Sequence, residues 1–94
     1  MTRQMTPESR PTRQDGLSLR ESGDESVLLD REHDRMYVMN DTALALWELC
    51  DGETTVEEML TAAVGLFDAD RAQLQHDVMD ALVAMEHRGL IVLP

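Results

Sequence analysis

The chain of 94 residues has no lysine, one cysteine and only three aromatic residues. A single cysteine, Cys50, cannot form an internal disulfide, and its place in an apolar helical pattern predicts a buried thiol. Because Trp47, Tyr37 and Phe67 are the only aromatic residues, the core must consist mainly of Leu, Val, Met and Ala. No run of 18 apolar residues and no signal-like segment occurs, so we expect a cytoplasmic protein that does not enter a membrane.

Cationic residues are also scarce, and the formal net charge is −11 at pH 7. Residues 1–14 carry three arginines and one glutamate, whereas residues 15–94 carry five arginines and eighteen acidic residues. Affinity for nucleic acid comes mainly from cationic contacts to phosphates. A domain this acidic is therefore not expected to bind nucleic acid. The charge favours a basic or neutral peptide as the partner.

The first 14 residues differ in composition from the remainder. They contain Pro7 and Pro11, and their only large apolar residues are Met1 and Met5. Such a segment buries too little apolar surface to offset the entropy of ordering it. We therefore expect residues 1–14 to be a disordered tail and residues 15–94 to form one small domain.

The domain begins with three short segments, 16–21, 27–30 and 36–39, and in the first of them Leu17 and Leu19 alternate with polar residues. Short alternating segments with polar connections predict an antiparallel meander. The last of them would lie at the edge of the sheet. An edge strand leaves backbone N–H and C=O groups unpaired, and such an edge is either protected or used to bind an incoming strand.

The pattern then changes to the helical period, and three helices are expected. Their boundary signals are Asn40 as the first N-cap, Asp51-Gly52 as the first stop, Thr54 with Glu57 or Thr55 with Glu58 as a capping box, Asp68 or Asp70 as the third start, and His87–Gly89 as the last stop. The apolar face of the second helix is Val56, Met59, Leu60, Ala63, Val64 and Phe67, and that of the third is Leu74, Val78, Ala81, Leu82 and Met85. Residues 90–93 are a short strand or an apolar tail. This order predicts an α+β fold: a small winged-helix-like domain with a three-stranded antiparallel sheet followed by three helices.

No catalytic or metal site is predicted. His33 lies in an acidic turn, 30–34, where Arg31 and the adjacent Arg35 would compete with any cation. His76 and His87 are about three helical turns apart, so they cannot share a metal ion. No nucleophile elbow, phosphate loop or Cys-x-x-Cys pair occurs. We expect neither enzymatic activity nor a cofactor.

Three short helices beside a hairpin are also the outline of a winged-helix DNA-binding transcriptional regulator, which is the alternative. Its recognition helix would be residues 71–89, which contain two arginines, no lysine and three acidic residues. Recognition helices need Arg, Asn or Gln at base edges and cations at phosphates. A peptide slot fits better, because Met79 and Val83 lie to one side of the core face of this helix and would form a wall beside the edge strand.

The order and spacing of several short segments resemble the PqqD family. These segments are Val27-Leu28-Leu29-Asp30, Tyr37-Val38-Met39-Asn40, Leu46-Trp47-Glu48-Leu49, Asp51-Gly52, Thr55-Val56-Glu57-Glu58, Asp77-Val78 and Arg88-Gly89-Leu90-Ile91. The similarity covers about residues 15–92. It implies a non-catalytic recognition element that binds the leader of a ribosomally synthesised precursor peptide. Such an element presents the leader to a separate enzyme, such as a radical SAM enzyme in pyrroloquinoline quinone synthesis or a leader peptidase in lasso-peptide synthesis.

The resemblance also implies the peptide-binding residues. The leader would add as a strand to the third strand and lie against the third helix. The implied residues are Arg35, Met36, Tyr37, Val38 and Met39 on the strand and Gln75, Met79, Leu82, Val83 and Glu86 on the helix.

Overall fold

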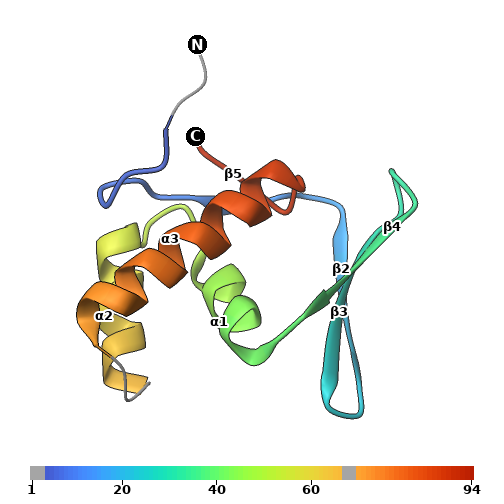
Figure 1. Ribbon diagram of the computed structural model, residues 1–94. Coiled ribbons are helices and arrows are strands. Elements are labelled where there is room, and N and C mark those ends of the chain that lie inside the picture. Colours follow the sequence, from blue (N-terminus) through green and yellow to red (C-terminus); the bar gives the residue numbers. More distant parts are fainter. Residues whose placement is uncertain (1–3, 67–69) are drawn as a thin grey trace.

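The structure, a computed structural model, describes residues 4–66 and 70–94. Strands Leu17–Ser22 (β2), Glu25–Asp30 (β3) and Arg35–Met39 (β4) form an antiparallel sheet in the order β2-β3-β4. Helices Asp41–Leu49 (α1), Val56–Leu66 (α2) and Arg71–His87 (α3) follow. Figure 1 shows this sheet beside the helices. The predicted α+β fold is confirmed.

Local signals explain where the helices begin and end. The Asn40 side chain accepts a hydrogen bond from the Ala43 N–H at 2.7 Å, as expected of an N-cap. Before α2, the Thr55 N–H donates to the Glu58 carboxylate, and the Glu58 N–H donates to the Thr55 hydroxyl. This is the capping box, with Thr55 rather than Thr54 as the cap. These hydrogen bonds lower the pKa of the Glu58 carboxyl.

The third helix starts and stops differently. Asp70 precedes α3 but its side chain makes no capping hydrogen bond. At the other end Gly89 has a φ of 74°, and the Leu90 N–H donates to the Met85 carbonyl at 2.9 Å. Glycine adopts this left-handed conformation without strain, which explains the stop. Phe67 and Asp68, expected on the second helix and at the third start, lie outside the described residues.

The core lies between the three helices, the last strand and the inner face of the sheet. Its buried apolar residues are Leu28, Met39, Leu46, Trp47, Cys50, Val56, Met59, Leu60, Ala63, Leu74, Val78, Leu82, Met85, Leu90 and Ile91. The predicted burial of Cys50 is confirmed, and this burial raises the pKa of its thiol to about 12. In the described parts of the chain, no helix is both long enough and apolar enough to cross a bilayer.

Residues 4–14 differ from the disordered tail expected for residues 1–14. Thr12–Arg13 (β1) pairs antiparallel with Ile91–Val92 (β5), and Pro11 is buried. The carbonyls of Ser9 and Pro7 accept the N–H groups of residues 56 and 57 at 3.0 and 2.9 Å.

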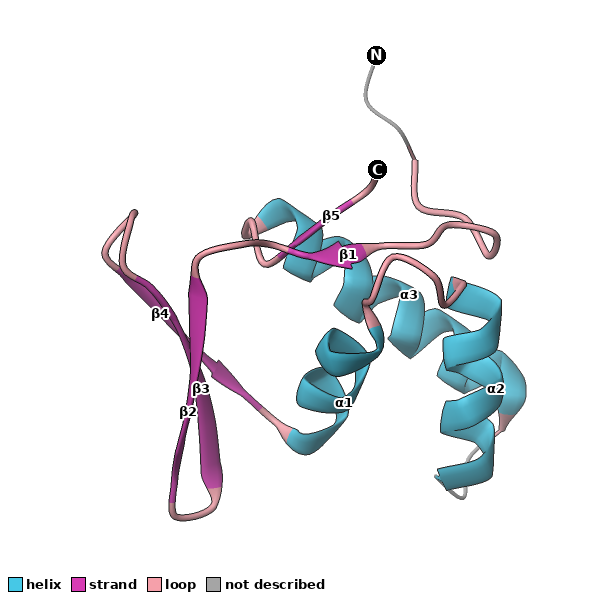
Figure 2. Ribbon diagram, turned by 180° about the vertical axis from the view of Figure 1, so that it is seen from behind, coloured by secondary structure: helices cyan, strands magenta, loops and turns pink. Residues whose placement is uncertain are grey.

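Composition did not indicate that residues 4–14 are ordered, because many of their contacts are backbone hydrogen bonds and only a few side chains, such as Pro11 and Met5, pack against the core. The first N–H groups of a helix need partners outside the helix, and the N-terminal segment provides two of them for α2. Figure 2 shows β1 and β5 in front of α3 at the top of the helices, with the chain running from β1 directly into β2. Whether the domain folds from residue 15 alone stays a prediction.

Candidate functional site

β4 is the edge strand of its sheet. Tyr37 lies opposite Leu28, and Val38 opposite Val27, so one side of β4 pairs with β3. Within residues 4–66 and 70–94 no strand pairs with the other side. In an antiparallel ladder alternate residues direct their N–H and C=O groups to opposite sides. The open side of β4 therefore presents backbone hydrogen-bonding groups at every second residue.

The side chains of β4 divide between two faces. Tyr37 is half-buried and packs on the core, and Met39 is buried. Met36 and Val38 point to the outer face and are 67% and 62% exposed. A strand added to β4 would continue this alternation, with every second side chain directed toward the helices. Met39 belongs to the core and is accessible to a guest mainly through its backbone.

Tyr37 also connects β4 to the end of α3. Its hydroxyl donates to the Arg88 carbonyl at 3.4 Å, a long hydrogen bond. Around this point lies an open pocket of about 400 Å³ between the N-terminal segment, the β3–β4 turn and the end of α3. It is lined by Gln14, Asp15, Asp30, Glu32, His33, Arg35, His87, Arg88 and Gly89.

Part of this pocket is held by the turn itself. The Asp30 carboxylate accepts the His33 backbone N–H at 3.2 Å and faces the His33 ring Nδ1 at 2.9 Å. The bond to the His33 side chain is the main reason that the pKa of Asp30 is lowered. Asp30 is therefore ionised at neutral pH and already has partners. Among the described residues there is no group of three or more His, Cys, Asp or Glu that could hold a metal ion.

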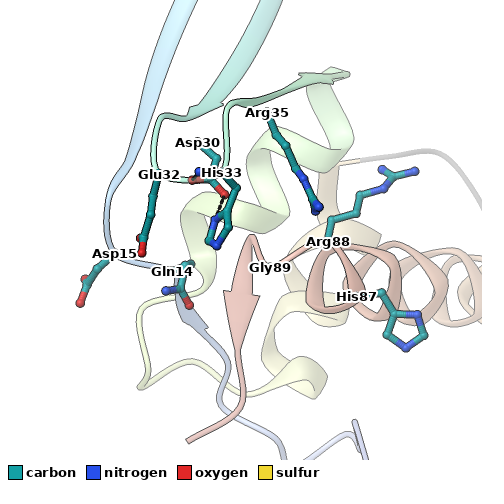
Figure 3. Close-up of a pocket in the computed structure, with 9 residues that line it drawn as sticks. All are labelled: Gln14, Asp15, Asp30, Glu32, His33, Arg35, His87, Arg88 and Gly89. Atoms are coloured by element: carbon teal, nitrogen blue, oxygen red, sulfur yellow. Dashed lines mark hydrogen bonds and ion pairs between the residues drawn. The ribbon is translucent and has the colours of Figure 1, made fainter.

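The two exposed flanks of α3 differ in their relation to β4. Figure 3 shows the Arg88 side chain on the side of Arg35, with His87 pointing away from it. Ala84 and Ala81 precede Arg88 by four and seven residues, so they share its side of the helix. We call Ala81, Ala84 and Arg88 the Arg88 flank. Both alanines are half-buried, and at its Arg88 end this flank lies on the side of β4 (Figure 3).

The sequence-predicted helix wall lies mostly on the other side. At 100° per residue, Met79 is about 180° from Arg88. Gln75 and Met79 line a separate shallow depression of about 280 Å³ with Ala72 and His76. We call Gln75, Met79, Val83 and Glu86 the Met79 flank. By its spacing this flank lies on the side of the helix opposite Arg88, and Leu82 between the two flanks is fully buried in the core.

The structure thus brings together Arg35, Tyr37 and the end of α3, and it adds the Arg88 flank, which sequence reasoning missed. The spacing of Ala81, Ala84 and Arg88 was visible in the sequence. However, small residues beside an apolar face do not show which flank turns toward the sheet. Peptide contact by any of these residues remains a prediction.

Comparisons with known proteins agree with this fold. The sequence model of the family described as Coenzyme PQQ synthesis protein D (PqqD) matches residues 25–91. A PqqA binding protein from Xanthomonas axonopodis pv. citri (strain 306) is 30% identical over 91 residues, which cover 95% of this chain and 97% of that protein.

Two solved structures have the same fold. One is TbiB1 in complex with the TbiA(beta) leader peptide, with a TM-score of 0.74 and 22% identity over 85% of this chain and 93% of that one. The other is lasso peptide synthetase B1 complexed with the leader peptide, with a TM-score of 0.75 and 19% identity over 89% of this chain and 99% of that one. The family match covers well over half of the sequence, and the resemblance inferred from the short segments is confirmed. This chain belongs to the PqqD family.

Proposed function

We propose that this protein binds the leader of a ribosomally synthesised precursor peptide as a strand added to β4, and delivers it to a separate peptide-modifying enzyme. The observation that carries this proposal is the open backbone edge of β4, which lies beside the end of α3. Strand addition supplies affinity through main-chain hydrogen bonds, and pockets for alternate side chains supply specificity. The relatives support it, since one is named for binding PqqA and two were solved with leader peptides.

The second wall of the slot is α3, and its two flanks compete for this role. The Arg88 flank lies on the side of β4 at its Arg88 end and has two alanines, which leave room for the side chains of a guest. The Met79 flank is more apolar but lies on the side of the helix opposite Arg88. We therefore place the guest between β4 and the Arg88 flank.

The partner enzyme belongs to the same proposal. A domain that holds a leader has to act beside the enzyme that modifies the precursor, and we place both in the cytoplasm. A radical SAM enzyme and a leader peptidase are the two classes proposed. A pull-down with each candidate enzyme, with and without the precursor, tests this part separately from leader binding.

A proline scan tests the edge directly. Arg35→Pro, Tyr37→Pro and Val38→Pro each remove one N–H from β4, and only those on the open side remove a donor to the guest. An outward proline should weaken binding by about 1 kcal/mol or more while the domain stays folded. Affinity is measured by fluorescence anisotropy with labelled synthetic leaders of candidate precursor peptides, and folding by circular dichroism.

Arg20→Pro on β2 is the matched control, because β2 is the opposite edge of the same sheet. It should leave leader affinity unchanged. If all three β4 variants are folded and bind the leader like the wild type, the edge is not the binding site.

Salt distinguishes this proposal from the winged-helix regulator. Binding to DNA should weaken steeply as salt rises, because counterions are released from the phosphates. Strand addition with apolar contacts should respond much less.

A further inference from the structure

Two arginines line the pocket at the end of the slot. Arg35 is the first residue of β4, and Arg88 follows the last residue of α3. Both line the pocket, and Figure 3 shows their side chains on its α3 side. Within the described residues, neither guanidinium lies within 4.0 Å of a carboxylate. By contrast, Arg71 pairs with Glu57 at 2.6 Å.

Among the pocket carboxylates, Asp30 lies opposite Arg35 in the β3–β4 register and interacts with its charge, but it forms no close ion pair with it. Asp30 is engaged by His33 through both of its oxygens. Asp15 and Glu32 lie on the opposite side of the pocket, toward the N-terminal segment (Figure 3). Arg35 and Arg88 place two positive charges on the α3 side of the pocket, so this side is complementary to a carboxylate.

The location of the pocket indicates the source of that carboxylate. A strand paired with β4 must pass Arg35 at one end, and the end of α3 meets β4 there through Tyr37 and Arg88. A side chain of the guest that points toward the helices at this end enters the pocket. Its partner groups would be the two guanidiniums, which bind carboxylates with planar, paired hydrogen bonds.

We propose that Arg35 and Arg88 form a subsite for an Asp or Glu side chain of the bound leader. This inference rests on the proposed function and specifies the chemistry of its guest. The remainder of the protein is strongly acidic, with a net charge of −11 for the whole chain. An acidic guest residue is therefore repelled along most of the surface and attracted at this pocket, so the subsite sets the register in which the leader binds.

A displayed peptide library identifies the preference without knowledge of the natural leader. Phage carrying random 20-residue peptides are selected on the immobilised full chain and on the Arg35→Glu/Arg88→Glu variant. We expect the wild type to select Asp or Glu at a fixed spacing from an apolar, strand-forming segment. The variant should select Lys or Arg at the same position.

The outcomes separate the subsite from the function. Peptides that bind wild type without an acidic preference would overturn the subsite and leave strand addition standing. Enrichment of Lys or Arg in the peptides selected by the wild type would also overturn the subsite. It would indicate that Asp15 and Glu32, rather than the two arginines, bind the guest side chain in this pocket. If neither protein selects any peptide, the proposed function fails as well.

Paired substitutions test the same contact quantitatively on one selected peptide. Arg88→Glu should weaken binding about tenfold, and Arg88→Lys should retain part of the affinity. Replacing the acidic residue of the peptide with Arg should restore binding to Arg88→Glu. Arg20→Glu changes the net charge equally at a site on β2 and should have little effect. Equal losses of peptide affinity in Arg20→Glu and Arg88→Glu would show that only the net charge of the protein matters. That result would contradict the subsite.

The double variant Arg35→Gln/Arg88→Gln covers the case in which the charge reversals do not fold. It removes both cations without placing two acids together, and it should also lose the acidic preference. Circular dichroism and Trp47 fluorescence establish that each variant is folded. A folded glutamine variant that keeps the wild-type preference would overturn the proposal.

Discussion

The helices and the β2-β3-β4 sheet contribute differently to this protein. Nearly all buried residues belong to the helices and to the segment after α3, whereas the sheet buries only Leu28, Asp30 and Met39. In both Figure 1 and Figure 2 the sheet projects from the helices rather than lying under them. The helices therefore supply most of the stability, and the sheet is free to present an unpaired edge. Substitutions should accordingly separate into those that unfold the domain and those that only change binding.

The largest effect is expected in the helices. Leu60→Asp places a carboxylate in the core, where Leu60 is 3% exposed, and should cost about 3 to 5 kcal/mol of unfolding free energy. Leu66→Asp is the control, since Leu66 lies in the same helix and is 74% exposed. Thermal melts by circular dichroism compare the two. Equal melting temperatures for both variants would contradict the division between helices and sheet.

The second effect concerns the N-terminal segment. Deleting residues 1–13 removes the β1–β5 pairing, the buried Pro11 and two partners of the first α2 N–H groups. We expect a loss of about 2 to 4 kcal/mol in chemical denaturation. Unchanged stability would mean that the domain starts at residue 15, as composition alone predicts.

Gly52→Ala sharpens this test. A Cβ at Gly52 would lie 2.7 Å from the Thr12 hydroxyl oxygen, and the φ of 81° is itself unfavourable for alanine. The substitution should therefore cost more in the full chain than in the truncated one, where only the backbone strain remains. Equal costs in the two backgrounds would show that Thr12 does not pack there.

A smaller effect, on binding alone, is expected where α3 meets the sheet. Ala84→Gln lengthens a side chain on the Arg88 flank, whereas Val83→Gln changes the neighbouring residue on the Met79 flank. If the guest lies between β4 and the Arg88 flank, Ala84→Gln should weaken leader affinity about tenfold or more, since it fills the slot. Val83→Gln should have little effect. The reverse result would restore the Met79 flank as the wall.

The smallest expected effect is on how the stability of the protein depends on pH, through Asp30 in the sheet. The hydrogen bonds of Asp30 to His33 lower its pKa below the usual value of 3.8. A carboxyl with a depressed folded pKa stabilises the protein above its unfolded pKa, and this contribution is lost as the pH falls through the folded pKa. Asp30→Asn should therefore flatten the fall in stability below about pH 4. An identical pH profile in wild type and variant would show that the Asp30–His33 contact is not formed in solution.

The sequence predicted the elements that depend on local chemistry. Asn40, the Thr55–Glu58 capping box and Gly89 each act on backbone groups within a few residues, so their effect can be inferred from spacing.

Two features could not be predicted in this way, because both depend on contacts between distant segments. The ordering of residues 4–14 relies on backbone hydrogen bonds to α2 and β5, and backbone groups leave no compositional signal. The choice between the flanks of α3 depends on how the helix is rotated relative to β4. Met79 and Val83 were favoured because they are apolar, but Figure 3 shows the Arg88 side chain on the side of Arg35, and the spacing of Ala81 and Ala84 places them on the same side of the helix as Arg88.

Amide hydrogen exchange is the most direct test of the central claim, that β4 binds a peptide strand at its open edge. It is measured by NMR on the full chain with and without the synthetic leader or a selected peptide. We predict that alternate amides between Arg35 and Met39 exchange at least about tenfold more slowly when the peptide is bound, because they gain hydrogen bonds. The outward amides of β2, at the other edge, should exchange at the same rate in both states. Unchanged exchange in β4 with saturating peptide, or slowed exchange in β2 instead, would contradict the account.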